Sequence, residues 1–308
     1  MNRAIATMPS AALRLGQVAF TVGLGLLLWH AADGPAILQA LAKANLAWLA
    51  AAITALLCQT VLSAWRWRIT AGALGQTLPL PRAIREYFLS QAINQALPGG
   101  VLGDATRAVR ARSEVGLGIS GLAVGIERLA GQIAMLITLA VAFAATYLWS
   151  GGLDWPKGYA GPVGLSLVGV IIGTTAATLL HKRFRLLGTR ASEWVDLALH
   201  ALLSKHVLPA QIGLGAAITI CNVTAFGFCA WAVGIPLSLA PFFAIVPIIL
   251  FTMLIPLTVS GWGVREGSAA LLLPMIGATV PDAVAASVLF GISMLIAAAT
   301  GLILMVIK

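Results

Sequence analysis

Three clusters of charged residues lie inside or beside apolar segments of this sequence. The clusters are Asp104 with Arg107, Glu127 with Arg128, and Arg265 with Glu266. A charge at membrane depth is costly unless it is paired or hydrated, so such residues indicate a functional site. A guanidinium group offers several donors to phosphate oxygens. The clusters therefore predict a site for a phosphate-bearing group, with carboxylates that position the arginines or bind a cation.

Breaks in the backbone accompany two of these clusters. They are Pro98, Gly99, Gly100 and Gly103 before the first cluster, and Gly261 and Gly263 before the third. Irregular backbone at membrane depth is tolerated only against protein or a water-filled cavity. The two breaks weakly resemble each other, which suggests an inverted repeat. Transporters built from inverted repeats bind their substrates where helices of both repeats are interrupted.

The spacing of the charges predicts how they pair. Asp104 and Arg107 are three residues apart, which places them on one face of a helix. Glu127 and Arg128 are adjacent and point about 100° apart, so each needs a partner from elsewhere. The simplest arrangement brings all six charges into one polar site between the two halves of the chain. The alternative is a set of internal ion pairs that lock broken helices, or side chains that reach water at the cytoplasmic edge.

The composition excludes a soluble globular protein. The chain has 308 residues, of which 60% are hydrophobic and 9% charged, and its mean hydropathy is +0.97. A soluble domain carries about a quarter charged residues. The net charge of +9 is better explained by membrane topology than by nucleic-acid binding.

Seven apolar runs are long enough to cross a membrane. They are residues 15–32, 45–64, 119–149, 161–180, 211–233, 242–259 and 283–307. Two shorter stretches, near 87–98 and 267–278, are predicted to be re-entrant or half-helices. The connection near 181–209 mixes apolar and basic residues, which favours an amphipathic cytoplasmic helix or a surface helix packed on its own loops. We therefore expect an all-α polytopic membrane protein with one domain over residues 1–308.

Basic residues predict the orientation of the chain. The connections 1–14, 65–118 and 181–210 hold fourteen Lys and Arg, whereas the opposite connections hold two. By the positive-inside rule the N-terminus is predicted to be cytoplasmic. We expect the protein to lie in the inner membrane of a bacterial cell. With seven crossings, and with both short segments entering from the cytoplasm, the C-terminus would lie outside.

The motifs, in this order, resemble the lysylphosphatidylglycerol synthase transmembrane-region family. The resemblance rests on Leu97-Pro98-Gly99 leading to Gly103-Asp104 and Arg107, then Glu127-Arg128, then Gly261-x-Gly263-Val264-Arg265-Glu266. It covers roughly residues 45–300. Two positions depart from the family pattern, Leu102 and Ser260, where the family often has glycine, but neither removes a charge.

This family is the membrane flippase half of the multiple peptide resistance factor and also occurs as stand-alone proteins. The resemblance implies a helical domain with re-entrant helices that moves polar lipids between leaflets. No long polar region follows Lys308 in this sequence, so we do not expect the chain to make lysylphosphatidylglycerol itself.

Three functions follow as hypotheses. The first is a flippase or carrier of phospholipids, anionic or aminoacylated, in which Arg107, Arg128 and Arg265 bind the phosphate. The second is an accessory protein that assembles with a lipid or glycan synthase, and the third is a membrane-embedded lipid-modifying enzyme. The histidines show no metal-ligand spacing, and no Walker-type motif appears, so we expect no metal, cofactor or ATP. Abundant small residues in the spans permit packing within one chain or between two copies.

Overall fold

Helices make up the structure throughout the part of the chain that it describes. The computed structural model describes residues 11–97, 101–112, 115–148, 190–237, 239–253 and 258–306. The helices are α1 (Ala11–Ala31), α2 (Gly34–Ala42), α3 (Leu46–Ala73), α4 (Leu80–Ala96), α5 (Leu102–Ala111), α6 (Gly116–Leu148), α8 (Arg190–Leu203), α9 (Leu208–Ala232), α10 (Leu239–Thr252), η1 (Val259–Gly261), α11 (Val264–Leu272), η2 (Leu273–Ile276) and α12 (Val280–Val306). These residues include no strand, so the predicted all-α membrane fold is confirmed.

Four of the described helices are long and apolar enough to cross a membrane. They are Leu46–Ala73, Gly116–Thr146, Leu208–Ala232 and Val280–Gly301. Helices α1 and α2 form a fifth candidate that bends by 90° between its two parts. These elements correspond to five of the predicted spans. The predicted span at 161–180 lies outside the described residues.

Local sequence explains where several helices begin. The side chain of Asn45 accepts a hydrogen bond of 2.9 Å from the backbone of Ala47 and so caps α3. The side chain of Asp33 caps α2, where Pro35 occupies the first turn. Helix α3 then continues to Ala73, well past the predicted end at residue 64. Arg66 and Arg68 therefore belong to this helix and not to the predicted connection 65–118.

The predicted crossing at 242–259 is not one continuous helix in the described residues. Helix α10 has 14 residues and ends at Thr252. At 1.5 Å per residue it is about 21 Å long, which is shorter than the apolar core of a bilayer. Positive φ angles at Ser260 (50°), Gly261 (78°) and Gly263 (87°) then turn the chain into α11. Glycine adopts such angles without the steric penalty of a Cβ atom, so the two glycines permit this reversal.

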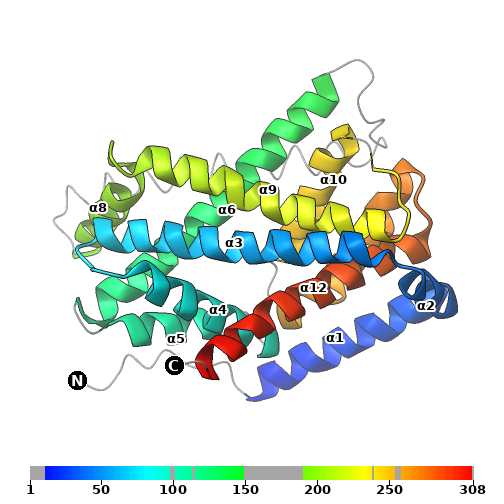
Figure 1. Cartoon of the computed structure of the whole chain (residues 1–308), viewed down its shortest axis with the longest axis horizontal. Helices are drawn as coiled ribbons and strands as arrows, with labels where there is room; N and C mark the ends of the chain where they lie inside the picture. The colour runs from blue at the N-terminus through cyan, green and yellow to red at the C-terminus, as the bar shows by residue number, and fades with distance from the viewer. Residues whose placement is uncertain are drawn as a thin grey trace.

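Two broken hairpins enter the bundle from opposite ends (Figure 1). Helices α4 and α5 enter from the end where α3 finishes, and Gln76 Nε2 donates to Ala111 O at 2.5 Å across the base of this hairpin. Helices α10 and α11 enter from the end where α9 finishes, beside the turn between α2 and α3, since Asn45 N donates to Ala232 O at 2.9 Å. The prediction that both short segments enter from the same end was therefore wrong.

The order of helix, hairpin and helix occurs twice along the chain. Helices α3, α4–α5 and α6 make the first set, and α9, α10–α11 and α12 make the second. Helices α3 and α9 pack antiparallel (Figure 1), α4 packs on α12, and α10 packs on α6. Each hairpin thus contacts the last helix of the other set, which is the form of an inverted repeat.

Buried apolar side chains of α3 and α9 join the two sets. Ala52 and Leu56 of α3 share a core with Val223 and Phe226 of α9, and all four side chains are 3% exposed or less. Without a hydrophobic driving force between helices in a bilayer, such close packing is a main source of association.

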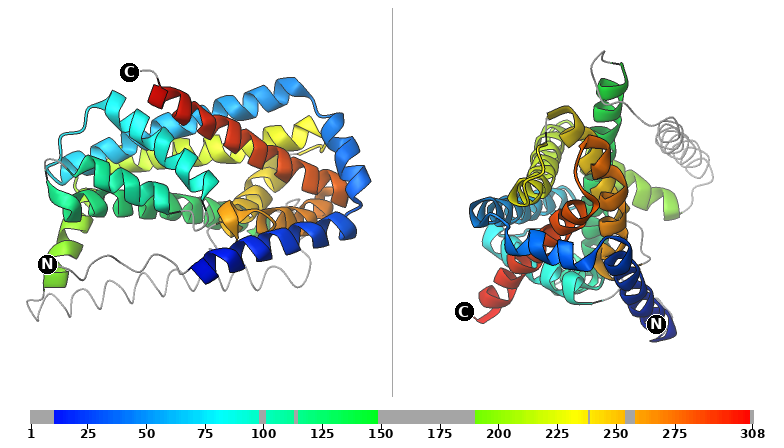
Figure 2. Two further views of the ribbon diagram at one scale, coloured as in Figure 1. Left: turned by 90° about the horizontal axis from the view of Figure 1, so that it is seen from below. Right: turned by 90° about the vertical axis from the view of Figure 1, so that its right-hand side faces the viewer.

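Helix α12 brings the chain back toward the end from which α1 starts (Figure 2). Its first turns share a cluster with Ile37 of α2. Near its other end, a Cβ atom on Gly301 would lie 2.5 Å from the carbonyl oxygen of Phe88 on α4. The described ends of α1 and α12 thus lie toward the same end of the bundle, unlike the expectation of an odd number of crossings.

The amphipathic connection predicted near 181–209 contains α8, and residues 181–189 lie outside the described part. Trp194 and Leu203 of α8 are exposed, whereas Ala201 is buried. Trp194 also packs over Gly118 of α6, where an added Cβ would lie 2.8 Å from its ring. One face of α8 thus packs on the bundle and the other presents apolar groups outward.

Candidate functional site

A cavity of about 570 Å³ lies where the tips of the two hairpins meet. Helices α3, α4, α6, α9, α10 and α12 and the segment around η1 contribute to its wall. Six of the lining side chains are amides: Gln59, Gln91, Asn94, Gln95, Gln132 and Asn222. Three methionines, Met135, Met253 and Met294, also line it, so the wall is both polar and apolar. Its volume is that of a typical small-molecule site.

A continuous chain of ion pairs stands against the wall formed by α3, α4 and α6. Glu127 accepts from Arg66 at 2.7 Å and from Arg107 at 3.2 Å. Arg107 also pairs with Asp104 at 3.0 Å, and Asp104 in turn pairs with Arg128. The side chains of Arg66, Arg107 and Glu127 are 3% exposed or less, whereas that of Arg128 is 39% exposed. The chain of pairs therefore runs from the protein interior to one accessible guanidinium.

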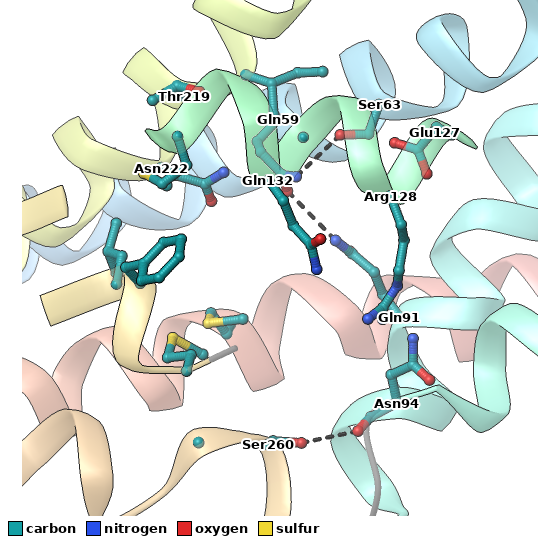
Figure 3. Close-up of a pocket in the computed structure, with 18 of the residues that line it drawn as sticks. Gln59, Ser63, Gln91, Asn94, Glu127, Arg128, Gln132, Thr219, Asn222 and Ser260 are labelled. Atoms are coloured by element: carbon teal, nitrogen blue, oxygen red, sulfur yellow. Dashed lines mark hydrogen bonds between the residues drawn. The ribbon is translucent and has the colours of Figure 1, made fainter. Parts of the chain in front are cut away.

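Helix geometry separates the two adjacent charges of α6. Glu127 and Arg128 point about 100° apart, as neighbours on a helix must. Glu127 is directed toward α3 and α5, while Arg128 lines the cavity, where Figure 3 shows its side chain reaching toward Gln91 and Asn94. The prediction that each needs a partner from elsewhere is confirmed.

The first turn of α5 is bound tightly to α4. Gly103 N donates to the side chain of Asn94 at 2.7 Å, and Ser90 Oγ donates to Asp104 at 3.2 Å. A Cβ atom on Gly103 would lie 1.9 Å from the carbonyl oxygen of Ser90. Gly103 therefore serves a close approach of two helices and lies within α5. The other predicted break residues before it, Pro98, Gly99 and Gly100, lie outside the described residues.

Aromatic rings enclose the guanidinium of Arg107. Its Cζ atom lies 4.6 Å from the ring centre of Trp67 and 4.3 Å from that of Tyr87. Tyr87 Oη also donates to Glu127 at 3.1 Å. Cation–π contacts and ion pairs together compensate for the loss of water around this charge.

Arg265 and Glu266 do not join this chain of ion pairs. Arg265 pairs with its own neighbour, Glu266, at 2.5 Å, and both bind Ser287 of α12. Glu266 also accepts from Gly263 N at 2.5 Å and so caps α11. The prediction that all six charges meet in one site was therefore wrong. At the start of a helix the carboxylate turns back toward the backbone, where the long arginine side chain reaches it.

Glu266 instead borders a second, mostly apolar cavity of about 330 Å³. This cavity lies between α1–α2 and α11–α12, and Trp29 and Trp262 are among its lining residues.

The break at the second hairpin nevertheless reaches the first cavity. Ser260 and Gly261 line it, and Ser260 Oγ donates to the carbonyl oxygen of Asn94 at 2.8 Å. This bond joins the tips of the two hairpins (Figure 3). Ser260, which departs from the family pattern, thus makes a contact that glycine cannot make.

Sequence reasoning missed several residues of this site. Arg66 was counted as a loop residue, although it is 3% exposed and binds Glu127. Gln59, Gln132 and Asn222 also went unnoticed, although polar amides within predicted apolar spans were a usable signal. Within the described ranges, no group of three or more His, Cys, Asp and Glu residues is placed to hold a metal ion.

A family model described as the lysylphosphatidylglycerol synthase TM region matches residues 14–301, nearly the whole chain. The chain belongs to this family. A comparison with curated proteins finds no match. Membership of the lysylphosphatidylglycerol synthase TM family, together with the apolar helices, makes the chain an integral membrane protein associated with lipid handling.

Proposed function

We propose that the chain is a carrier that moves polar lipids between the two leaflets of a membrane. The observation that carries this proposal is the polar cavity at the meeting point of two hairpins that enter from opposite ends. Transporters built from inverted repeats bind their substrates at such paired interruptions. A head group in this cavity would be surrounded by amides while its acyl chains stay among the apolar helices.

The chain of ion pairs suggests different roles for the arginines. Arg128 lines the cavity with an accessible side chain and is the group we assign to the head-group phosphate. Arg66 and Arg107 are buried against Glu127 and hold the wall in place. Arg265 supports the second hairpin through Glu266 and Ser287. Only Arg128 of the three predicted phosphate ligands keeps that role in this proposal.

The proposal assigns no catalytic step to the chain. Asp104 and Glu127 each accept from two arginines, which engages them as structural acceptors. A general acid or base instead needs a proton that it can exchange with a substrate. We infer facilitated or ion-coupled movement, since the sequence contains no Walker-type motif.

The test is leaflet reversal of fluorescent phospholipids in proteoliposomes that contain the purified protein. Asn222→Trp places a large ring in the cavity and should lower the rate of reversal about fivefold or more. Thr224→Trp is the matched control, because Thr224 is on the same helix but is absent from the cavity wall. Both variants should elute and melt as folded protein. Equal rates in the two variants, or no movement above empty liposomes, would reject the carrier proposal.

A further inference from the structure

We propose that the wall of the cavity formed by α6 and α9 binds hydroxyl groups, so that the substrates are lipids whose head group carries a glycerol or a sugar. This inference rests on the proposed function and names its substrate class. It is carried by three uncharged polar side chains that line the cavity, Gln132, Thr219 and Asn222.

The opposite wall, formed by α3 and α4, is largely bonded to itself. Gln59 Nε2 donates to Ser63 Oγ at 3.0 Å, and Gln91 Nε2 donates to Gln59 Oε1 at 3.4 Å. Thr60 Oγ1 in turn donates to Gln91 Oε1 at 2.8 Å. Gln95, at the end of α4, makes no hydrogen bond with the described residues and adds one free amide at the hairpin tip. This wall is therefore ordered without a ligand and offers few free groups.

The wall formed by α6 and α9 differs in this respect. The side chains of Gln132, Thr219 and Asn222 make no hydrogen bond with any residue that the structure describes. A threonine within a helix can donate to a carbonyl one turn earlier, as Thr224 of α9 does to Ile220 O at 2.8 Å. Thr219 is 3% exposed and makes no such bond. A buried hydroxyl without a partner is costly, and a ligand that bonds to it removes that cost.

The fold directs these three side chains into one space. Thr219 and Asn222 are three residues apart on α9, which places them on the same face of that helix. Helix α6 packs on α9, since a Cβ atom on Gly215 would lie 3.2 Å from the Cβ atom of Ala134. Figure 3 shows Gln132 and Asn222 facing the same open region. Two helices thus present unbonded polar groups to a volume that holds a head group.

The chemistry of these groups suits hydroxyls. Each carboxamide offers two N–H donors and a carbonyl acceptor, and the threonine hydroxyl both donates and accepts. A phosphate oxygen only accepts and an ammonium group only donates, so either would leave part of this wall unpaired. A hydroxyl donates and accepts from one atom, so a glycerol or a sugar can bond to several of these groups at once. A site built to bond hydroxyls discriminates against an analogue that lacks them, because its own polar groups are then left unpaired.

The test measures binding of short-chain lipids to the full-length protein in detergent by native mass spectrometry. Two pairs of lipids are compared, with identical acyl chains in each pair. Phosphatidylglycerol and phosphatidylpropanol share charge and carbon number and differ in two hydroxyls. Glucosyl diacylglycerol and its tetrahydropyranyl analogue are uncharged and differ in the hydroxyls of the sugar. The hydroxylated lipid should bind about tenfold tighter than its partner.

Soluble glycerophosphoglycerol and methyl glucoside distinguish a lipid from a free polyol. Both should bind at least tenfold more weakly than the corresponding lipid, because they lack acyl chains to bury among the apolar helices. Equal binding of the soluble compounds would assign the site to a free polyol and would overturn the lipid class named here.

Matched variants connect the preference to this wall. Thr219→Val and Asn222→Leu remove polar groups with little change in size, so each should lower the advantage of the hydroxylated lipid several-fold. The double variant should nearly abolish it, whereas Thr219→Ser keeps the hydroxyl and should retain it. Thr224→Val is the control, since Thr224 is on the same helix but does not line the cavity. Melting temperatures in detergent check that every variant is folded.

The outcomes separate this inference from the carrier proposal. Equal binding within both pairs by the unaltered protein overturns the inference, even if leaflet reversal is observed. An unchanged preference in the double variant also overturns it. A preference within at least one pair that the double variant loses and Thr219→Ser retains supports the inference, even if no leaflet reversal is observed and the carrier proposal fails.

Discussion

Glu127 is the residue around which the polar part of the molecule is built. It lies within an apolar helix, it is 1% exposed, and it accepts from Arg66, Arg107 and Tyr87. A buried carboxylate is tolerated when its charge and its lone pairs are satisfied in this way. Removal of the Glu127 charge would leave Arg66 and Arg107 buried with too little negative charge beside them.

Glu127→Gln should therefore lower the free energy of unfolding by about 3–5 kcal/mol, the usual cost of removing one member of a buried pair. Thermal unfolding in detergent measures this as a lower melting temperature. Glu86→Gln is the comparison, because its partner Arg110 is 41% exposed and can turn to water when the buried carboxylate loses its charge, so its loss should be smaller. Equal losses in the two variants would show that the pairs around Glu127 do not stabilise the fold.

At the scale of elements, the hairpin of α4 and α5 depends on a close approach between its two helices. The contact at Gly103 leaves no room for a side chain, because a Cβ atom would lie 1.9 Å from backbone of α4. The hydrogen bond from Gly103 N to Asn94 and the ion pair of Asp104 with Arg128 both lie in the first turn of α5. Displacement of α5 would therefore disturb the wall of the cavity as well as the packing.

Gly103→Ala should lower the free energy of unfolding by about 1–3 kcal/mol, as overpacking usually does. It should also lower leaflet reversal, because Arg128 loses its anchor. Gly121→Ala provides the comparison, since a Cβ atom at Gly121 of α6 meets nothing within 4 Å. That variant should be neutral or slightly stabilising. Thermal unfolding and the proteoliposome assay report both effects, and similar melting temperatures for the two variants would contradict this role of Gly103.

At the scale of the whole molecule, the two hairpins enter from opposite ends of the bundle. The α2–α3 turn and the turn before α12 lie at one end, whereas the turn between α5 and α6 lies at the other (Figure 1). Arg82, Arg110 and Arg112 lie at this second end. By the positive-inside rule we predict that this end is cytoplasmic.

Single cysteines test this topology after Cys58, Cys221 and Cys229 are replaced by serine. Lys43→Cys and Thr279→Cys should react with an impermeant maleimide in intact cells, because both exposed positions lie at the outer end. Arg112→Cys should react only after permeabilisation. If Thr279→Cys also reacts only after permeabilisation, as Arg112→Cys should, the second hairpin would lie at the cytoplasmic end.

The sequence by itself predicted the membrane class, the helical fold and five of the spans. It also predicted that the side chains of Glu127 and Arg128 point in different directions and have separate partners. These features follow from local properties, namely the length of apolar runs and the 100° rotation between neighbours on a helix. It also identified four residues that the structure brings together, Asp104, Arg107, Glu127 and Arg128.

Only the tertiary structure decided which charges meet and from which end each hairpin enters. Arg66 joins Glu127 because α3 continues past its apolar run and packs on α6, whereas Arg265 finds its acceptor in the adjacent Glu266. Helix α10 ends after 14 residues, and positive φ angles at Ser260, Gly261 and Gly263 lead the chain into α11. Pairing and chain reversal depend on distances between segments far apart in sequence, and the cost of an unpaired buried charge does not specify which partner removes it.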